Sequence, residues 1–237
     1  MKPDPGFPAI LLAGGFGTRL RSVVPDLPKP LAPVQGRPFI TYLLDQLVEA
    51  GWTRAIVCLH YHAEQVIRQL GQSYGPLALD YSVETEPLGT GGAVRLALEK
   101  ADAPRYLVLN ADSFCGVALA DFVAFHLAHG FPASLISINV PDTSRYGALN
   151  LAPDGRILAL AEKDGTHRPG PINGGIYLVD RALAKSIPEG RPISLEREIF
   201  PLWLEEGFMA WQRSAPFIDI GVPESYAQAQ SMFNAPR

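Results

Sequence analysis

Apolar residues in the first half of the chain form short runs that alternate with amphipathic stretches. Residues 9–12 are one such run, and Gly14 and Gly15 end it, so the pattern predicts a strand followed by a loop. Residues 39–50 place apolar side chains on one helical face and polar ones on another, with Gly51 as a stop signal. The same patterns predict further strands at 55–59, 77–83 and 106–109 and further helices at 63–70 and 91–100.

The second half of the chain is less regular. Its patterns predict helices at 119–129, 195–206 and 223–232 and strands at 133–139, 148–151, 157–161 and 175–179. Repeated alternation of strands and helices predicts an α/β fold with right-handed crossovers. We expect a Rossmann-like, mostly parallel central sheet with helices on both faces, which the second half extends with mixed strands. Because the chain shows no repeat, low-complexity tract or long linker, residues 1–237 are expected to form a single domain.

The composition narrows the range of partners and locations. With 24 acidic and 20 basic side chains, the chain gives no electrostatic reason to expect a nucleic-acid or anionic-membrane partner. Only Cys58 and Cys115 are present, which excludes a disulfide scaffold and a Cys-x-x-Cys metal site. Residues 1–8 have no signal-peptide core, and no run approaches the roughly 18 to 20 apolar residues of a membrane span. These features predict a cytoplasmic protein.

Glycines and cations follow the first predicted strand, where an open α/β sheet places its chemistry. The segment from Gly14 through Gly17 and Thr18 to Arg19 is followed, across a proline-rich loop, by Lys29. Glycines let backbone N–H groups approach a phosphate, and the two cations supply charge to phosphate oxygens in a transition state. Taken alone, however, a glycine run with solvated cations is more often an ordinary surface turn.

The common nucleotide-binding motifs fit this segment poorly. A dinucleotide fingerprint needs a third glycine where Leu20 stands and a helix directly after it, and Pro25, Pro28 and Pro30 prevent a regular helix there. A P-loop needs Gly-Lys-Ser/Thr, which is absent. These departures oppose a nicotinamide-dependent oxidoreductase.

The composite G-G-x-G-T-R-L with P-K-P-L downstream resembles the signature of the sugar-1-phosphate nucleotidyltransferases. Later segments resemble further motifs of that family in the family's order: Pro87–Ala93, Asn110–Asp112, Tyr146–Gly147, Glu162–Lys163, Asn173–Tyr177 and Asp219–Glu224. The resemblance extends from Ala9 to Tyr226 and is greatest to the D-glycero-α-D-manno-heptose 1-phosphate guanylyltransferases. It implies the nucleotidyltransferase fold, with GTP and a sugar 1-phosphate as partners and Mg²⁺ as cofactor.

The resemblance also implies roles for individual positions. Those that would bind the nucleotide phosphates are Leu12, Gly14, Gly15, Gly17 and Thr18, with Arg19 on the leaving pyrophosphate and Lys29 near the α-phosphate. Those that would face the base are Glu84, Gly89 and Thr90. Those that would bind the sugar phosphate are Lys163 on its phosphate and Gly147, Glu162 and Asn173 on its sugar. Asp112 and Asp219 would hold Mg²⁺. Ala111 and Val222 stand where many relatives have Gly and Thr, and neither change removes a ligand or a charge.

Each of these assignments has a simpler alternative when its residue is taken singly. Asp112 follows a strand that is apolar on both faces, so it belongs at the carboxyl edge of the sheet, and Mg²⁺ prefers one or two carboxylates with water and phosphate oxygens. Alone, Asp112 would equally suit a cap on the turn 113–116, and Asp219 a turn before Gly221. Glu162–Lys163 would be a solvated pair, and Asn173–Gly174 a hairpin turn.

Base specificity rests on one carboxylate. An ionised Glu84 accepts hydrogen bonds but donates none. It therefore suits the adjacent N1–H and N2–H₂ donors of guanine better than it suits uracil, and GTP is expected.

The expected transfer needs no general base, because the attacking sugar 1-phosphate is a phosphate monoester with a second pKa near 6 and is already about dianionic at neutral pH. The alternatives left open are a mannose-1-phosphate guanylyltransferase, a uridylyl- or thymidylyltransferase, and a catalytically inactive nucleotide-sensing homologue.

Two pairs of histidines could in principle bind a metal, His60 with His62 and His126 with His129. Neither pair has a third metal ligand at a recognisable spacing, so these histidines are expected to be ordinary surface or core residues.

Overall fold

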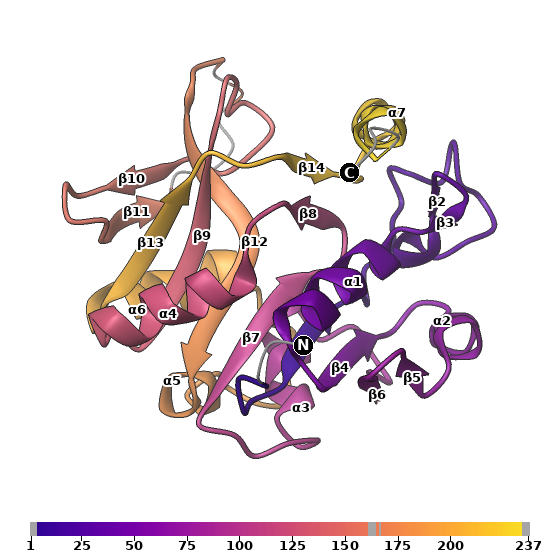
Figure 1. The fold of residues 1–237 in the computed structure, drawn as a ribbon, viewed down its shortest axis with the longest axis horizontal. Coiled ribbons are helices and arrows are strands. Elements are labelled where there is room, and N and C mark those ends of the chain that lie inside the picture. The colour runs from indigo at the N-terminus through magenta and orange to yellow at the C-terminus, as the bar shows by residue number, and fades with distance from the viewer. Residues whose placement is uncertain (1–3, 161–164, 166, 234–237) are drawn as a thin grey trace.

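The computed structural model describes residues 4–160, 165 and 167–233. Its central sheet has eight strands, in the order β13 (Phe208–Arg213), β9 (Ala133–Val140), β12 (Gly170–Asp180), β7 (Arg105–Asn110), β1 (Ala9–Leu12), β4 (Arg54–Leu59), β6 (Leu77–Val83) and β5 (Ser73–Tyr74) (Figure 1). Strands β7, β1, β4 and β6 are parallel neighbours, as are β13 and β9. Strand β12 is antiparallel to both of its neighbours, and β5 is antiparallel to β6. The predicted mostly parallel sheet with a mixed extension is confirmed.

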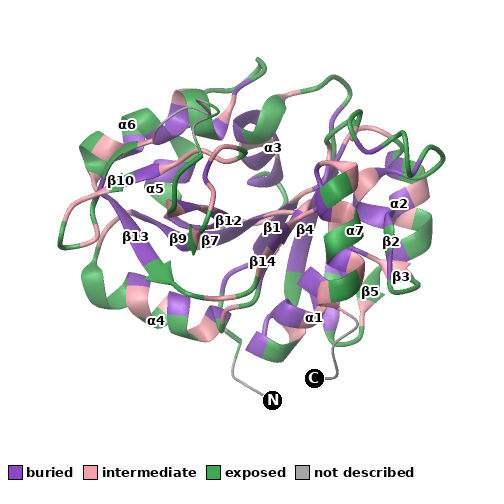
Figure 2. Cartoon of the chain, turned by 90° about the horizontal axis from the view of Figure 1, so that it is seen from above, coloured by how far each residue is buried: buried purple, intermediate pink, exposed green. Residues whose placement is uncertain are grey.

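Helices cover both faces of this sheet (Figure 2). Helices α3 (Gly89–Ala97), α5 (Arg181–Lys185) and α6 (Phe200–Glu206) lie on one face, and α1 (Ile40–Ala50) and α4 (Leu119–His129) lie on the other. Helices α2 (Ala63–Leu70) and α7 (Pro223–Met232) complete the set in the described residues. Because the central strands are covered on both sides, they are apolar on both faces, and Ile10 and Leu11 are fully buried.

Amphipathic periodicity predicted several elements with the observed bounds. These are α2, β6, α4 and α7. The predicted helix 195–206 is instead two elements, a short π-helical segment η2 (Leu195–Ile199) followed by α6. Pro201 lies in the first turn of α6 and has no N–H to donate to the carbonyl of Arg197, so a continuous α-helical ladder is impossible there.

Strand β12 contains Asn173–Gly174, for which a hairpin turn was the simpler alternative. It begins at Gly170, five residues before the predicted start, and Asn173–Gly174 lie inside it rather than in a hairpin turn. Its register against β9 shifts between Asn173 and Tyr177. The Asn173 side chain accepts a hydrogen bond from the Gly175 backbone N–H at 2.9 Å, so a local side-chain contact accommodates the irregularity.

Three short two-stranded sheets and one short helix lie outside the main sheet. They are β8 (Ser113–Cys115) with β14 (Phe217–Asp219), β10 (Leu149–Leu151) with β11 (Ile157–Leu160), β2 (Pro33–Val34) with β3 (Arg37–Pro38), and the 3-10 helix η1 (Lys29–Leu31). Residues 113–115 therefore form a strand, which excludes the turn considered for them. Strands β10 and β11 were predicted within one residue of their observed bounds. The other elements were not predicted, because segments of two or three residues carry no readable period.

A small second apolar cluster joins the segment around Lys29 to the C-terminal part of the chain. Its buried members are Leu20, Val24, Ala32, Val34, Phe39, Tyr42, Ile218, Ile220 and Ala229. This packing fixes the loop before α1 against the strand that ends at Asp219. Within the described residues, no helix has both the length and the apolar character that crossing a membrane requires.

Candidate active site

A cleft of about 1210 Å³ opens at the carboxyl ends of β1 and β7 and is walled on its other side by loops of the second half. The predicted site residues that line it are Leu12, Gly14, Gly15, Arg19, Lys29, Glu84, Gly89, Thr90, Asp112, Gly147, Asn173 and Asp219. Gly17 and Thr18 are not among its lining residues, and Glu162 and Lys163 lie outside the described residues. The volume lies above the roughly 300 to 1,000 Å³ of a pocket for one small ligand, which suits two substrates bound side by side.

The glycine-rich loop packs directly against the lysine that follows it. Gly17 has a φ of +59°, a left-handed conformation that favours glycine, and a Cβ there would lie 3.1 Å from the Cβ of Lys29. Gly17 thus packs against the base of the Lys29 side chain and does not line the cleft. Arg19 is exposed at the rim, and among the described residues it has no ion pair. Its guanidinium is therefore available to an incoming anion.

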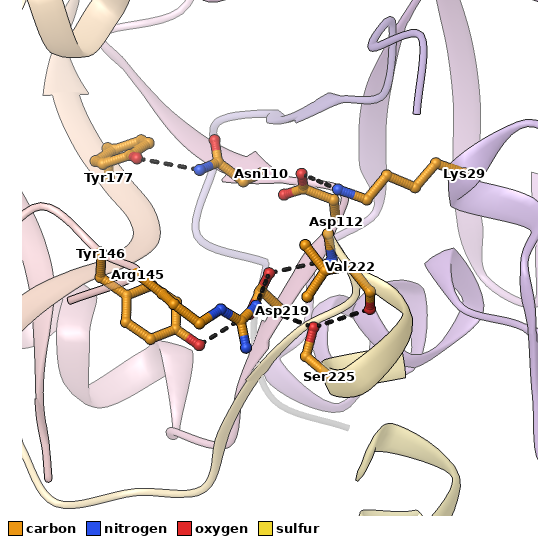
Figure 3. A network of polar contacts seen from close by, with 10 residues as sticks. Lys29, Asn110, Asp112, Arg145, Tyr146, Tyr177, Asp219, Val222 and Ser225 are labelled. Carbon is orange, nitrogen blue, oxygen red and sulfur yellow. Dashed lines mark hydrogen bonds and ion pairs between the residues drawn. The ribbon is translucent and has the colours of Figure 1, made fainter. Parts of the chain in front are cut away.

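Lys29 and Asp112, which both line the cleft, form an ion pair (Figure 3). The Nζ atom of Lys29 lies 2.6 Å from Oδ2 of Asp112, and the lysine side chain is 12% exposed while the aspartate is 47% exposed. Asp112 follows β7, and Lys29 begins η1. The ammonium is held in place by packing, whereas the carboxylate faces the open cleft.

Asp219 reaches the same place through the pairing of β14 with β8. In that ladder Asp219 lies opposite Ser113, and the Ile220 N–H donates to the Asp112 carbonyl at 2.9 Å. Two carboxylates from distant parts of the chain therefore meet beside each other. Hard oxygen ligands of this kind suit Mg²⁺, and the described residues hold no cluster of three or more His, Cys, Asp or Glu side chains. One or two carboxylates, completed by water and phosphate oxygens, fit that ion.

Asp219 is surrounded by hydrogen-bond donors (Figure 3). Tyr146 donates its hydroxyl to Oδ1 at 2.8 Å, and the Gly221 N–H donates to Oδ2 at 3.1 Å. Arg145 contacts both oxygens through Nη2, at 3.1 and 3.3 Å. Burial and the negative charge of Asp219 raise the pKa of Tyr146 well above its ordinary value, so this phenol stays protonated and remains a donor.

Glu84 lines the cleft near the glycine-rich loop and is only 7% exposed. Its Oε2 accepts the Leu88 N–H at 2.7 Å, and a Cβ on Gly14 would lie 3.3 Å from its Oε1. Burial raises the pKa of Glu84, while the Leu88 N–H and the nearby His60 oppose that rise. With one oxygen bound to its own loop, the carboxylate offers guanine a single acceptor in this geometry, rather than the two that a bidentate contact needs.

Asn173 and Tyr177 form a polar pair on the opposite wall. Asn173 Nδ2 donates to the Tyr177 hydroxyl at 2.9 Å, and Asn110 Nδ2 lies 3.3 Å from the same oxygen. Both amide orientations are thereby fixed in the wall of the cleft. Thr90 accepts the Leu195 N–H at 2.8 Å and ties α3 to η2, so its hydroxyl also serves a structural contact.

Several cleft residues were missed by reasoning from the sequence. Arg145, Glu196 and Arg197 all line the cleft. A signal existed for Arg145, which directly precedes the Tyr146–Gly147 motif. Glu196 and Arg197 lie in the predicted helix 195–206, but nothing in its pattern indicated that its first turns are π-helical and line the cleft.

Three of the histidines considered in the sequence make hydrogen-bond contacts within the fold. His60 Nδ1 contacts the Glu84 carbonyl, His126 is buried beside Ser134, and His129 contacts the Phe125 carbonyl. No metal site forms around them within the described part of the chain.

Comparison with known proteins gives a consistent result. The family model described as nucleotidyl transferase matches residues 8–235. The D-glycero-alpha-D-manno-heptose 1-phosphate guanylyltransferase of Aneurinibacillus thermoaerophilus is 35% identical over 223 residues, covering 94% of this chain and 96% of that protein. The mannose-1-phosphate guanylyltransferase catalytic subunit beta of Drosophila pseudoobscura pseudoobscura is 33% identical over 96% of this chain, which spans 62% of that longer protein.

A solved structure with a similar fold carries a nucleotide ligand. The crystal structure of HddC from Yersinia pseudotuberculosis, complexed with GMP-PN, matches with a TM-score of 0.86 and 33% sequence identity. The match covers 96% of this chain and all of that chain. Similarity therefore extends over both walls of the cleft and is not confined to the glycine-rich loop.

Proposed function

The chain belongs to the nucleotidyl transferase family, and from that premise and the geometry of the cleft we propose that it transfers a nucleoside monophosphate from a nucleoside triphosphate to a sugar 1-phosphate. The favoured reaction uses GTP and D-glycero-α-D-manno-heptose 1-phosphate and yields the nucleotide sugar and pyrophosphate. We further propose that residues 1–237 act as one domain that binds both substrates, and that the reaction takes place in the cytoplasm.

The observation that carries this proposal is the convergence of cations and carboxylates on one cleft. Lys29, Asp112 and Asp219 meet beside the glycine-rich loop, and the facing wall presents Asn173 and Gly147. A glycine loop with cations suits polyphosphate, and amide and backbone groups suit sugar hydroxyls. Such an arrangement holds two anionic substrates face to face.

In the proposed reaction a phosphate oxygen of the sugar 1-phosphate attacks the α-phosphorus of the triphosphate. The bond between the α-phosphorus and the bridging oxygen breaks on the opposite side, and pyrophosphate leaves with the electron pair. Because the attacking phosphate is already about dianionic at neutral pH, no side chain has to remove a proton. The protein's task is to align the two anions and to stabilise the charge that moves to the leaving group.

The cations and carboxylates divide this task. Arg19 stabilises the departing pyrophosphate, and Lys29 contacts the α-phosphate, which it reaches from its packed position beside Gly17. Lys163 binds the phosphate of the sugar substrate. Asp112 and Asp219 would hold Mg²⁺, and a bound Mg²⁺ would neutralise phosphate charge. Backbone N–H groups of the glycine-rich loop bind the remaining phosphate oxygens.

A mannose-1-phosphate guanylyltransferase activity is the second candidate. It is supported by the 33% identity to relatives with that name, which extends over 96% of this chain. The heptose assignment is favoured because the heptose 1-phosphate guanylyltransferase is similar over almost its whole length as well.

The proposal is tested by mixing the protein with GTP, Mg²⁺ and the heptose 1-phosphate and following pyrophosphate release, with mass spectrometry of the nucleotide-sugar product. Release should require both substrates and should stop when either is omitted. GTP binding without any pyrophosphate release from a panel of sugar phosphates would instead indicate a nucleotide-sensing homologue.

A further inference from the structure

The two carboxylates of the cleft differ in how much of their hydrogen-bonding capacity is already used. Asp112 pairs with Lys29 through Oδ2, and among the described residues nothing donates to its Oδ1. Asp219 accepts from three residues, and both of its oxygens are engaged. An ionised carboxylate has about four acceptor positions, so Asp219 is saturated and Asp112 is not.

Asp219 must therefore lose a donor before it can bind a cation. The Gly221 N–H is fixed by the turn that carries both residues, because a Cβ on Gly221 would lie only 2.7 Å from Asp219 Oδ2. Tyr146 is half-buried, and its ring packs edge-on against Phe217 with centroids 5.6 Å apart. Neither group can withdraw without moving the backbone or a packed ring.

Arg145 is the donor that can leave. Its side chain is 40% exposed, against 21% for Asp219, and its contacts with Asp219 and Ser225 all use the single nitrogen Nη2. The long, partly solvated side chain can swing away by rotating about its own bonds, at a cost typical of a partly exposed ion pair. Figure 3 shows the Arg145 guanidinium next to the Asp219 carboxylate. Arg145 also lines the cleft.

We propose that Arg145 acts as a counter-ion that occupies Asp219 while the cleft is empty and competes with a divalent cation for that carboxylate. The inference rests on the proposed function only in taking Asp219 as a metal ligand. Arg145 keeps the buried side of the cleft close to neutral before substrates arrive, just as Lys29 does for Asp112. The two pairs differ because Lys29, at 12% exposed, is held by packing and stays, whereas Arg145 is displaced.

The competition also couples the two walls of the cleft. Arg145 and Tyr146 belong to the segment between β9 and β10, which carries Gly147, while Asp219 ends β14. Arrival of a cation at Asp219 therefore removes one of the two side-chain contacts that attach this segment to the metal-binding carboxylate. The remaining Tyr146 contact keeps the segment in place.

The test is a titration of Mn²⁺ into metal-free protein in the absence of any nucleotide, in which the paramagnetic resonance signal of free Mn²⁺ reports binding. Arg145→Gln should bind Mn²⁺ roughly two- to fivefold more tightly than the wild type, the size expected for removing one partly exposed competing ion pair. Arg145→Lys, which keeps the charge but loses the planar guanidinium, should lie between the two.

Two controls make the result specific. Arg156→Gln removes a guanidinium from an exposed Arg–Asp pair outside the cleft, the 2.8 Å contact with Asp154, and should leave Mn²⁺ affinity unchanged. Adding Asp219→Asn to Arg145→Gln should abolish the gain in Mn²⁺ affinity that Arg145→Gln produces. The inference is overturned if Arg145→Gln binds Mn²⁺ no more tightly than the wild type, if Arg156→Gln shows the same gain, or if the gain survives in the double variant.

These outcomes are independent of turnover. Pyrophosphate release by the wild type together with an unchanged Mn²⁺ affinity in Arg145→Gln would refute the counter-ion role and leave the proposed function standing. The converse pattern, tighter Mn²⁺ binding with no transferase activity in any protein, would refute the proposed function alone. Circular dichroism of each variant establishes that it is folded before titration.

Discussion

The ammonium of Lys29 and the carboxylate of Asp112 meet at 2.6 Å although 83 residues separate them in the chain. Lys29 lies after a proline-rich loop and packs on Gly17, and Asp112 follows strand β7, whose four central residues are buried. The pair therefore depends on the whole first half of the fold. It places a cation and a candidate metal ligand at the same point of the cleft.

The first prediction concerns Asp112. Asp112→Asn should lower kcat roughly 100-fold or more, because it removes a charged ligand from the place where phosphate charge is neutralised. The fold should survive, since this side chain is 47% exposed and takes no part in the core. Asp102→Asn, at an exposed aspartate that pairs with Arg181 and Lys185 outside the cleft, is the matched control and should keep full activity. Full turnover with Mg²⁺ in Asp112→Asn would sink the metal assignment.

The second prediction separates the two lysines. Lys29→Ala should chiefly lower kcat, because a contact with the reacting α-phosphate strengthens in the transition state. Lys163→Ala should chiefly raise KM for the sugar phosphate, because its contact with that phosphate is similar before and during the reaction. Steady-state kinetics with each substrate varied in turn distinguishes the two. Equal effects of both changes on both KM values would contradict the division.

The third prediction concerns base recognition by Glu84. In Glu84→Gln the amide oxygen can still accept the Leu88 N–H, so the loop stays anchored. The amide nitrogen would then face the N–H donors of guanine. Transition-state binding should weaken by about 1 kcal/mol or more, which lowers kcat/KM for GTP about fivefold or more. The measurement compares GTP with ATP in both proteins. An unchanged preference for GTP would remove Glu84 from the explanation without affecting the reaction itself.

The fourth prediction is a pH dependence of stability that originates at His126. Burial lowers the pKa of this histidine from its ordinary 6.5, and the hydrogen bond to Asp180 only partly opposes that effect. As the pH falls below about 6.5, the unfolded chain binds a proton at this site before the folded protein does, so the free energy of unfolding should decrease. Urea unfolding at pH 7.5 and 5.5 measures this change.

Substitution tests the assignment to His126. His126→Gln should cost about 1 to 3 kcal/mol at pH 7.5, because a buried hydrogen bond to Ser134 is disturbed, and should flatten the loss between the two pH values. His129→Gln changes an exposed histidine on the same helix and should keep the wild-type profile. A wild-type stability that increases on acidification over this interval would contradict the sign of the shift.

The elements with a clear period were predictable from the sequence, and those set by distant contacts were not. Helices α2, α4 and α7 were predicted with the observed bounds because their amphipathic or flanking signals are local. The Asn-Gly-Gly of β12 has the composition of a turn, yet these residues continue a strand whose bulge is supported by the Asn173 side chain. No local pattern contains that contact.

For the candidate site, the identity of many residues was predictable from the sequence, but the contacts of each side chain were not. The cleft residues were found because glycines and charged residues at strand ends resemble those of a known family in order and content. The state of each group was not predictable, since it depends on which partner the fold supplies. Asp219 is saturated by Arg145, Tyr146 and the Gly221 N–H, and one oxygen of Glu84 accepts the Leu88 N–H.

The most direct test of the account is the measurement of kcat/KM for GTP, UTP, CTP, ATP and dTTP, each with heptose 1-phosphate and with mannose 1-phosphate. The account predicts measurable pyrophosphate release with GTP, the highest kcat/KM for GTP with the heptose substrate, and strict dependence on a divalent cation. A higher kcat/KM for UTP or dTTP than for GTP would contradict both the reading of the base and the assignment as a heptose 1-phosphate guanylyltransferase.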